Sequence, residues 1–413
     1  MFWILLPIRI SRSLKKMPYV TIVLITINTF IAVLLALAAK NPQILSKIYQ
    51  NFGFMADERA WYTWFTYMFL HAGFAHLLGN MIFLWLFGAA LEDVLGKSKY
   101  LFIYLAGGLM AALAQTSIKI IFLPNAPVAP LIGASGAVGA LLGVFILRFF
   151  RNEMTVFYFV WFLTIFRWGT FEISSLLALG AWVGMEVVSG FLQILSGAAG
   201  GVAHWAHIGG FAFGLLAAKI IKLEVEAGKE YLAEEAATLA KSGDHTEAAA
   251  KYEELINKEP ASPEVLLKAA RMYANSEQRD KAVKRYVKAL EGLLKNNELD
   301  KAFEAYSELI EFYYPDLVLE PRLQFRVGTI CESKTNFELA VDAFQKVIYN
   351  YPRSLQAELS LLRMGQVFLK MGEEEEASKI FREFLDRYPF SQWKALAENE
   401  VRKVASHSRA RFH

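Results

Sequence analysis

Apolar residues follow two different patterns along the 413 residues of the chain. As far as residue 221 they form long runs with few charged side chains, whereas beyond Glu224 they recur at helical spacing among charged residues. A helix needs about 20 predominantly apolar residues to cross the hydrocarbon core of a membrane. An amphipathic helix, by contrast, buries one face and leaves the other in water. The pattern therefore predicts a membrane domain followed by a soluble helical domain.

Six apolar runs in the first half qualify as membrane-spanning helices. They cover residues 20–39, 77–91, 100–122, 131–149, 173–195 and 203–221. Glycine and alanine are frequent in the later runs, which favours close packing of helices in lipid. A seventh apolar and aromatic stretch, 154–168, is short for a span, so it either crosses the membrane or lies at its interface.

The first 18 residues carry their apolar stretch ahead of their basic residues. A secretory signal has the opposite order, with its charges before the apolar core. We therefore expect residues 1–18 to form a short interfacial helix that leads into the first span.

Basic residues predict the orientation of the chain, because they are enriched in cytoplasmic loops of membrane proteins. With six spans, the cytoplasmic basic residues are Arg9, Arg12, Lys15, Lys16, Lys97, Lys99, Arg148, Arg151, Arg167, Lys219 and Lys222. A minority, Lys40, Lys47, Arg59 and Lys119, falls at or beyond the outer surface. Seven spans would place Lys219 and Lys222 outside. We therefore expect six spans with both termini cytoplasmic, and the size and domain arrangement favour a bacterial inner membrane.

The remaining composition narrows the classes of function. The single cysteine, Cys331, allows no disulfide framework within the chain. The sequence contains no motif with the spacing of a metal-binding cluster. We expect this cysteine to pack in a helix core, and we expect neither a metal nor a cofactor. The net charge of +3 gives no reason to expect a nucleic-acid partner.

The fourth run opens with Gly133-Ala134-Ser135-Gly136, which makes Ser135 a candidate nucleophile. A serine in a membrane helix usually bonds to its own backbone or fills a packing contact. Here Gly133 and Gly136 leave space beside the hydroxyl for a backbone amide to approach a reacting carbonyl.

The sixth run contributes a candidate base, His207. An ionisable side chain within a span suggests a functional site, and Gly210 and Gly214 give this helix a small-residue face for close packing. With six spans, the fourth and sixth runs both begin at the outer surface, so Ser135 and His207 are expected at the same shallow depth. A serine hydroxyl is a weak nucleophile that an imidazole within hydrogen-bond reach can activate.

His76 and Asn80 lie at the start of the second span, His76 directly before the apolar run 77–91. This span also begins at the outer surface. Residues four apart share one face of a helix. Their side-chain donors could stabilise an oxyanion, or they could form hydrogen bonds between helices. The presence of Ser135 and His207 at the same depth favours the first interpretation.

These motifs occur in a familiar order. The serine motif at 133–136, the histidine motif at 206–214, and His76 with Asn80 together resemble the signatures of rhomboid intramembrane proteases, over residues 15–221. For the seventh apolar stretch, residues 154–168, the resemblance favours an interfacial segment over a span. It also implies that the fifth span borders the opening through which a substrate helix enters.

The resemblance further implies a mechanism. Ser135 would attack the scissile carbonyl, and His207 would act first as base and then as acid, without an acidic third residue. His76, Asn80 and the backbone amide of Ser135 would form the oxyanion hole, in a loop that Gly133 shapes. The substrate would be another membrane protein, cleaved in a transmembrane helix within the lipid bilayer.

A small residue, an aromatic residue and a proline recur at spacings of four and then eight in the second half. The three complete copies are Ala248, Tyr252 and Pro260; Ala340, Phe344 and Pro352; and Ala377, Phe381 and Pro389. The pattern resembles tetratricopeptide repeats, in which helix pairs stack into a solenoid. We expect four to five repeats that bind a cytoplasmic protein or peptide; a structural cap or a self-association domain is the alternative.

The expected fold is therefore all-α, with a six-helix transmembrane bundle followed by a soluble α-solenoid of TPR-like helix pairs. We divide the chain into residues 1–18, 19–222, 223–400 and a frayed basic tail at 401–413. The expected function is that of an intramembrane serine endopeptidase acting near the outer face. The alternative is a catalytically silent rhomboid-like scaffold that binds transmembrane helices. A transporter is disfavoured because acidic residues are scarce in the spans, where only Glu172 and Glu186 qualify.

Overall fold

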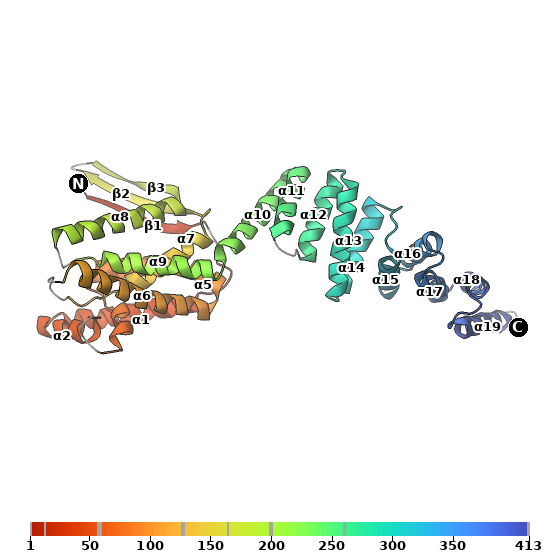
Figure 1. Cartoon of the computed structure of the whole chain (residues 1–413), viewed down its shortest axis with the longest axis horizontal. Coiled ribbons are helices and arrows are strands. Elements are labelled where there is room, and N and C mark those ends of the chain that lie inside the picture. The colour runs from red at the N-terminus through yellow and green to blue at the C-terminus, as the bar shows by residue number, and fades with distance from the viewer. Residues whose placement is uncertain are drawn as a thin grey trace. The chain divides into compact units, whose positions relative to one another are not determined.

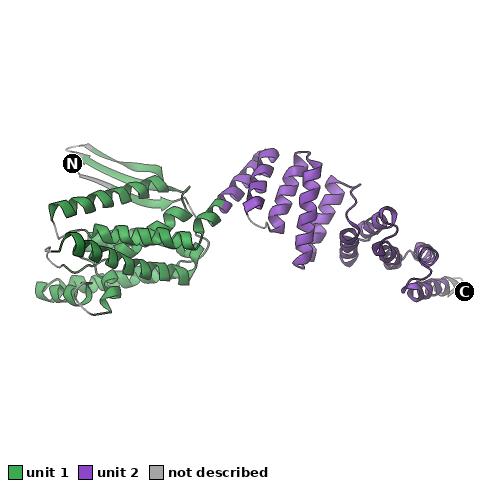
Figure 2. Cartoon of the chain, in the orientation of Figure 1, with its two compact units in different colours: residues 1–228 green, residues 229–413 purple. Residues whose placement is uncertain are grey.

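The computed structural model describes residues 2–11, 14–55, 60–124, 129–162, 165–197, 201–258 and 262–410. Arg12, Arg59, Pro260 and the last three residues of the predicted tail lie outside these ranges. The chain forms two compact units, Met1–Gly228 and Lys229–His413, each with its own hydrophobic core (Figure 2).

Helices occupy all six apolar runs of the first unit, as predicted (Figure 1). They are α1 (Tyr19–Ala38), α4 (Phe74–Phe83) continued by the π-helical turn η2 (Leu84–Gly88) and α5 (Ala89–Leu95), α6 (Lys97–Phe122), α7 (Ser135–Arg148), α8 (Ser175–Ser196) and α9 (His204–Ile220). Within the described residues, four helical segments are long and apolar enough to cross a membrane, namely α1, α4 through α5, α6 and α8. The apolar helix α7 is shorter, with 14 residues, and the number of six crossings stays a prediction.

Short helices fill the loop between the first two runs. They are α2 (Pro42–Phe52), α3 (Thr63–Thr66) and the 3-10 turn η1 (Tyr67–Phe69). The Asn41 side chain accepts hydrogen bonds from two backbone N–H groups in the first turn of α2, which satisfies donors that the helix leaves free. A backbone bridge between Phe54 and Leu131 then ties this loop to the segment that leads into Ser135.

A three-stranded antiparallel sheet stands where the sequence predicted other structure. Its strands are β1 (Phe2–Ile10), β2 (Glu153–Phe162) and β3 (Ile165–Ser174), in the order β1-β2-β3. The register pairs Phe2 with Trp161 and Ile10 with Met154. The helix expected within residues 1–18 is therefore wrong. Residues 154–162 and 165–168 belong to β2 and β3 and not to a spanning helix, whereas their place at the membrane interface stays a prediction. Aromatic and β-branched residues fit a pleated surface, and Met154 and Val156, two apart, both face the core.

α7 lies buried along almost its whole length and packs against α6 and α9. A β-carbon on Gly210 would collide with the carbonyl oxygen of Gly136, and one on Gly214 would collide with that of Ala140. Glycine therefore lets the backbones of α7 and α9 touch, as the small-residue faces of these helices predicted. This contact brings the first turns of the two helices together.

The second unit consists of consecutive helices in which almost every helix packs against the next (Figure 1). They are α10 (Leu223–Ser242), which contains the boundary between the units, α11 (His245–Lys258), α12 (Pro263–Asn275), α13 (Arg279–Lys295), α14 (Leu299–Glu308) with the π-helical turn η3 (Leu309–Tyr313), α15 (Pro321–Ser333), α16 (Phe337–Asn350), α17 (Leu355–Met371), α18 (Glu374–Arg387) and α19 (Lys394–Ala410). The tail expected to fray from residue 401 is instead helical to Ala410, supported by ion pairs such as Glu398–Arg402.

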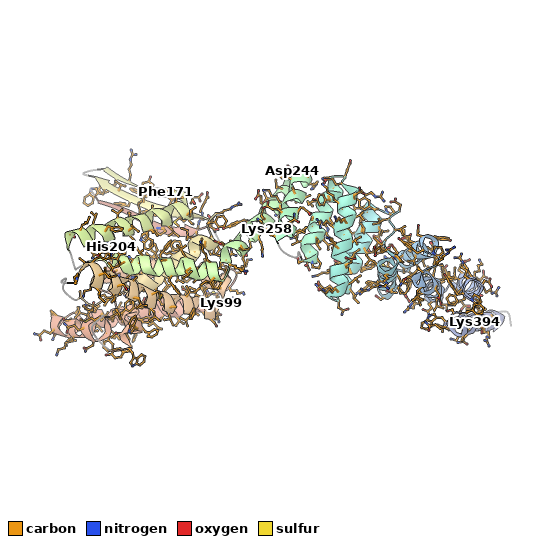
Figure 3. All side chains as sticks on the ribbon, viewed as in Figure 1. Lys99, Phe171, His204, Asp244, Lys258 and Lys394 are labelled. Carbon is orange, nitrogen blue, oxygen red and sulfur yellow. The ribbon has the colours of Figure 1, made fainter. Side chains whose placement is uncertain are left out.

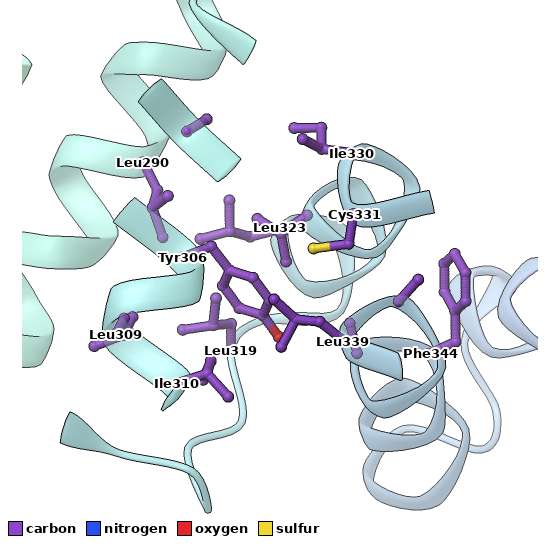
Figure 4. Close-up of a cluster of buried hydrophobic side chains, with 14 of the residues drawn as sticks. Leu290, Tyr306, Leu309, Ile310, Leu319, Leu323, Ile330, Cys331, Leu339 and Phe344 are labelled. Atoms are coloured by element: carbon purple, nitrogen blue, oxygen red, sulfur yellow. The ribbon is translucent and has the colours of Figure 1, made fainter. Parts of the chain in front are cut away.

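The repeat pattern marks the core of this solenoid. Its described small and aromatic members, Ala248, Tyr252, Ala340, Phe344, Ala377 and Phe381, are all buried. The Phe344 ring lies 2.8 Å from where a β-carbon on Gly328 would stand, and Phe381 meets Gly365 at 2.7 Å in the same way. Cys331 lies in the same buried cluster as Tyr306 and Phe344 (Figure 4), as expected of a core residue, and burial raises the pKa of its thiol to about 12.

Candidate active site

Ser135 is the first residue of α7 and follows a loop that depends on Gly133. Gly133 has a φ of 117°, a conformation that favours glycine, and its N–H donates to the carbonyl oxygen of Tyr67 at 2.9 Å. A β-carbon on Gly133 would lie 2.8 Å from the His76 ring and 3.6 Å from Ser135 Oγ. Glycine at this position therefore lets the loop pass between the serine and the His76 ring.

His207 lies in the first turn of α9, and its Nε2 atom is 2.8 Å from Ser135 Oγ. The His207 side chain is 12% exposed, and Trp182 of α8 stacks on its ring with centroids 6.1 Å apart and planes inclined by 29°. The backbone N–H of Ala206 donates to Gln115 Oε1 on α6 at 3.1 Å, which fixes the start of α9. The serine and the imidazole, predicted from separate helices, thus lie within hydrogen-bond distance.

His76 and Asn80 line the same cavity as Ser135 and His207, a space of about 670 Å³. The His76 ring contacts His71 edge to face, with centroids 5.1 Å apart. Asn80 donates from Nδ2 to the carbonyl oxygen of His76 at 3.1 Å, so this bond lies within one helix and not between helices. The amide has a second N–H to offer. The four polar side chains predicted from the sequence therefore gather around one cavity.

A carboxylate that the sequence analysis did not assign to the site lies behind His207. Glu186 Oε2 on α8 is 2.7 Å from His204 Nδ1 and 3.0 Å from His207 Nδ1. This position differs from the expectation that no acidic group accompanies the serine and histidine. The available signal was an ionisable residue in the middle of an apolar helix, but the sequence did not say which neighbouring helix Glu186 faces.

Comparisons with known proteins agree with this division of the chain. The model of the rhomboid domain matches residues 58–223, and a tetratricopeptide repeat model matches residues 324–354 and 359–391. The proposed rhomboid protease YdcA of Bacillus subtilis (strain 168) is 36% identical over 95 residues, which are 23% of this chain and 45% of YdcA. Rhomboid protease GluP of the same organism is 39% identical over 83 residues, 20% of this chain and 15% of GluP. Rhomboid-related protein 2 of Mus musculus is 35% identical over 95 residues, 23% of this chain and 29% of that protein.

The chain thus spans less than half the length of these curated relatives. Among solved structures, that of YrrB, described as a TPR protein with an unusual peptide-binding site, covers 41% of this chain and 90% of its own at 16% identity, with a TM-score of 0.23. A score this low supports no functional comparison. The matched models and the helical architecture lead to one conclusion: the chain joins a rhomboid domain to tetratricopeptide repeats, and its apolar helices are those of a multi-pass membrane protein.

Proposed function

We propose that the protein is an intramembrane serine endopeptidase that cleaves transmembrane segments of other proteins near the outer face of the membrane. The observation that carries this proposal is the distance of 2.8 Å between His207 Nε2 and Ser135 Oγ. An isolated hydroxyl is a poor nucleophile, and a neighbouring imidazole is the group that activates it. A silent scaffold for membrane helices has no need of this pair.

The reaction follows from the two side chains. Ser135 Oγ attacks the scissile carbonyl carbon while its proton passes to His207 Nε2, and the carbonyl oxygen becomes an oxyanion. The C–N bond then breaks, and His207 returns the proton to the leaving amine. Water next attacks the acyl ester and gives a proton to His207. The ester C–O bond breaks, and Ser135 recovers its proton.

The start of α7 supplies the electrostatic part of the proposal. The first N–H groups of a helix lack partners within that helix, and its N-terminus carries partial positive charge. Ser135 opens α7, so its backbone amide is available to an oxyanion. The side chains of His76 and Asn80 line the same cavity, and we assign them as the further donors.

The substrate follows from the place of this site. Peptide bonds in a stable helix are shielded by hydrogen bonding within the helix, so the cleaved segment should contain small or helix-breaking residues. Polar groups of the cavity, such as Gln115 and Gln193, would hold the water that hydrocarbon excludes. The repeats of the second unit would recruit or sense a cytoplasmic protein or peptide.

The test compares the wild type with Ser135→Ala on a model transmembrane substrate in detergent. We expect Ser135→Ala to lose more than about a thousandfold in activity, because the nucleophile is removed. Thermal unfolding of both proteins would confirm that the variant is folded. Equal cleavage by the two proteins would rule out the serine mechanism and leave the scaffold.

A further inference from the structure

The face of α8 that packs on α9 contains one polar residue between two apolar contacts. Trp182, Glu186 and Gly190 are spaced by four, so they lie on one side of the helix. Trp182 stacks on the His207 ring, and a β-carbon on Gly190 would lie 3.1 Å from the Trp205 ring. A carboxylate in an apolar membrane helix costs free energy unless it has partners. Its place between two packing contacts therefore calls for a specific role.

Glu186 has two histidine partners at the start of α9, where Figure 3 labels His204. Its Oε2 atom lies 2.7 Å from His204 Nδ1 and 3.0 Å from His207 Nδ1. The Glu186 side chain is 13% exposed, and those of His204 and His207 are 19% and 12% exposed, so water competes little for these contacts. The His204 contact meets hydrogen-bond geometry, whereas the His207 N–H is not aligned on the oxygen. Catalytic hydrogen bonds are often loose in this way before substrate binds.

The two nitrogens of His207 therefore face two different groups. Nε2 faces Ser135 Oγ at 2.8 Å, and Nδ1 faces the Glu186 carboxylate. Nε2 can accept the serine proton only if Nδ1 carries the ring hydrogen, and a carboxylate beside Nδ1 favours that tautomer. It also stabilises the imidazolium that forms when the serine proton arrives.

We propose that Glu186 is a positioning residue that orients His207, so that Ser135, His207 and Glu186 act as a triad assembled from three helices. His204 is a second, separate partner of the same carboxylate. This inference rests on the proposed function, because it assigns a role within the same site. The structural alternative is that Glu186 ties α8 to α9 through His204 alone.

The experiment measures kcat and KM of the full chain in detergent on the model transmembrane substrate. We expect Glu186→Gln to lower kcat roughly tenfold to a hundredfold with little change in KM, because the imidazole is misoriented while substrate binding is intact. Glu186→Asp should recover part of the lost kcat, since it restores the charge. Glu172→Gln is the matched control: Glu172 is 57% exposed and lies 3.8 Å from Arg9, so its removal should leave kcat unchanged.

His204→Ala separates the two roles of the carboxylate. If Glu186 orients His207, His204→Ala should cost less kcat than Glu186→Gln, because the carboxylate stays beside His207 Nδ1. Equal losses in the two variants would mean that Glu186 is only a tie between helices, and the inference would be wrong. Wild-type kcat in Glu186→Gln would also overturn it; if Ser135→Ala were inactive in the same assay, the proposed function would stand.

Discussion

Two independent constraints act on Gly133. Its φ of 117° is costly for any residue with a β-carbon, and the space that a β-carbon would enter is closed by the His76 ring at 2.8 Å. The same residue therefore sets the backbone path into Ser135 and the distance between that path and a proposed oxyanion donor. A methyl group added at Gly133 would therefore displace groups next to the reacting atoms.

We predict that Gly133→Ala lowers cleavage more than about tenfold and lowers the free energy of unfolding by about 1–3 kcal/mol, because both the strain and the clash must be relieved. Gly184→Ala is the matched control, since no heavy atom lies within 4 Å of its β-carbon site and alanine favours a helix. Cleavage rates and thermal unfolding in detergent would check both variants. A Gly133→Ala protein with wild-type cleavage would contradict the role of this loop.

The candidate site could be predicted from the sequence only as far as its local motifs reached. Ser135, His207, His76 and Asn80 each sit beside glycines or at a helical spacing that signals a function, and all four line one cavity. Glu186 has no such motif. Its role depends on the rotation of α8 against α9, which is decided by packing contacts between helices and not by the order of residues in either one.

At the scale of elements, a buried carboxylate joins α1 to α5. Glu92 accepts hydrogen bonds from the backbone N–H groups of Val20 and Thr21 at 2.9 and 2.8 Å, and from the Thr21 hydroxyl at 2.9 Å. Tyr19 begins α1, so these N–H groups are ones that a helix leaves without partners. The carboxylate thus caps one helix from the end of another.

We predict that Glu92→Ala lowers the free energy of unfolding by about 2–3 kcal/mol, because hydrogen bonds to a charged group are lost and buried donors are left unpaired. Glu92→Gln should cost less, since its amide oxygen can still accept. Thermal unfolding in detergent measures both, with the exposed Glu172→Gln as reference. Similar unfolding of Glu92→Ala and wild type would refute the capping role.

The sheet shows why some elements could not be predicted. β1 pairs with β2, although helices α1 to α7 lie between the two strands in the sequence. Short apolar stretches flanked by basic residues, as in 1–18 and 154–168, are also typical of interfacial segments. Strands form here because β1 and β2 pair over a long distance in the sequence. The only local signal of that pairing is the aromatic and β-branched residues of β2 and β3.

Some turns between helices of the solenoid contain a residue other than glycine at positive φ. Glu277, Asn297 and Thr335 adopt a φ near 60° between helices, where Gly243 and Gly372 stand in other turns. Thr335 is β-branched, so this conformation is strained. Thr335→Gly should raise the stability of α15 and α16 by about 0.5–1 kcal/mol after the entropy of glycine is subtracted. Hydrogen exchange of these helices would show slower opening; faster opening would contradict the prediction.

At the scale of the whole molecule, the repeat unit has a hydrophobic core of its own. Its buried pairs of small and aromatic residues are joined by ion pairs between successive helix pairs, such as Arg271 with Glu308 at 2.6 Å and Lys370 with Glu332 at 2.7 Å. The sequence predicted the helical repeats of this unit, because three copies of the same local pattern recur along it. We predict that residues 224–413 express as a soluble helical domain, checked by circular dichroism and size-exclusion chromatography; an aggregated or unfolded fragment would contradict its independence.

The positions of the site residues bear on whether the membrane unit crosses the membrane an even or an odd number of times. His76 lies in the first turn of α4, Ser135 opens α7, and His207 lies in the first turn of α9. Because all three line one cavity, the three helices begin on the same side, and the chain must cross an even number of times between these starts. The antiparallel hairpin of β2 and β3 returns to the side from which it leaves, so it does not alter this count.

This argument favours six crossings over seven, and basic residues then decide the direction. We predict that a reporter fused after Lys222 is cytoplasmic, whereas one fused after Asn41, beyond α1, is on the outer side. A fluorescent protein active only inside and a phosphatase active only outside would check both positions. Phosphatase activity at both positions would mean an odd number of crossings, and it would place His207 and Ser135 on opposite sides of the membrane. Their contact at 2.8 Å is the physical reason to expect the other result.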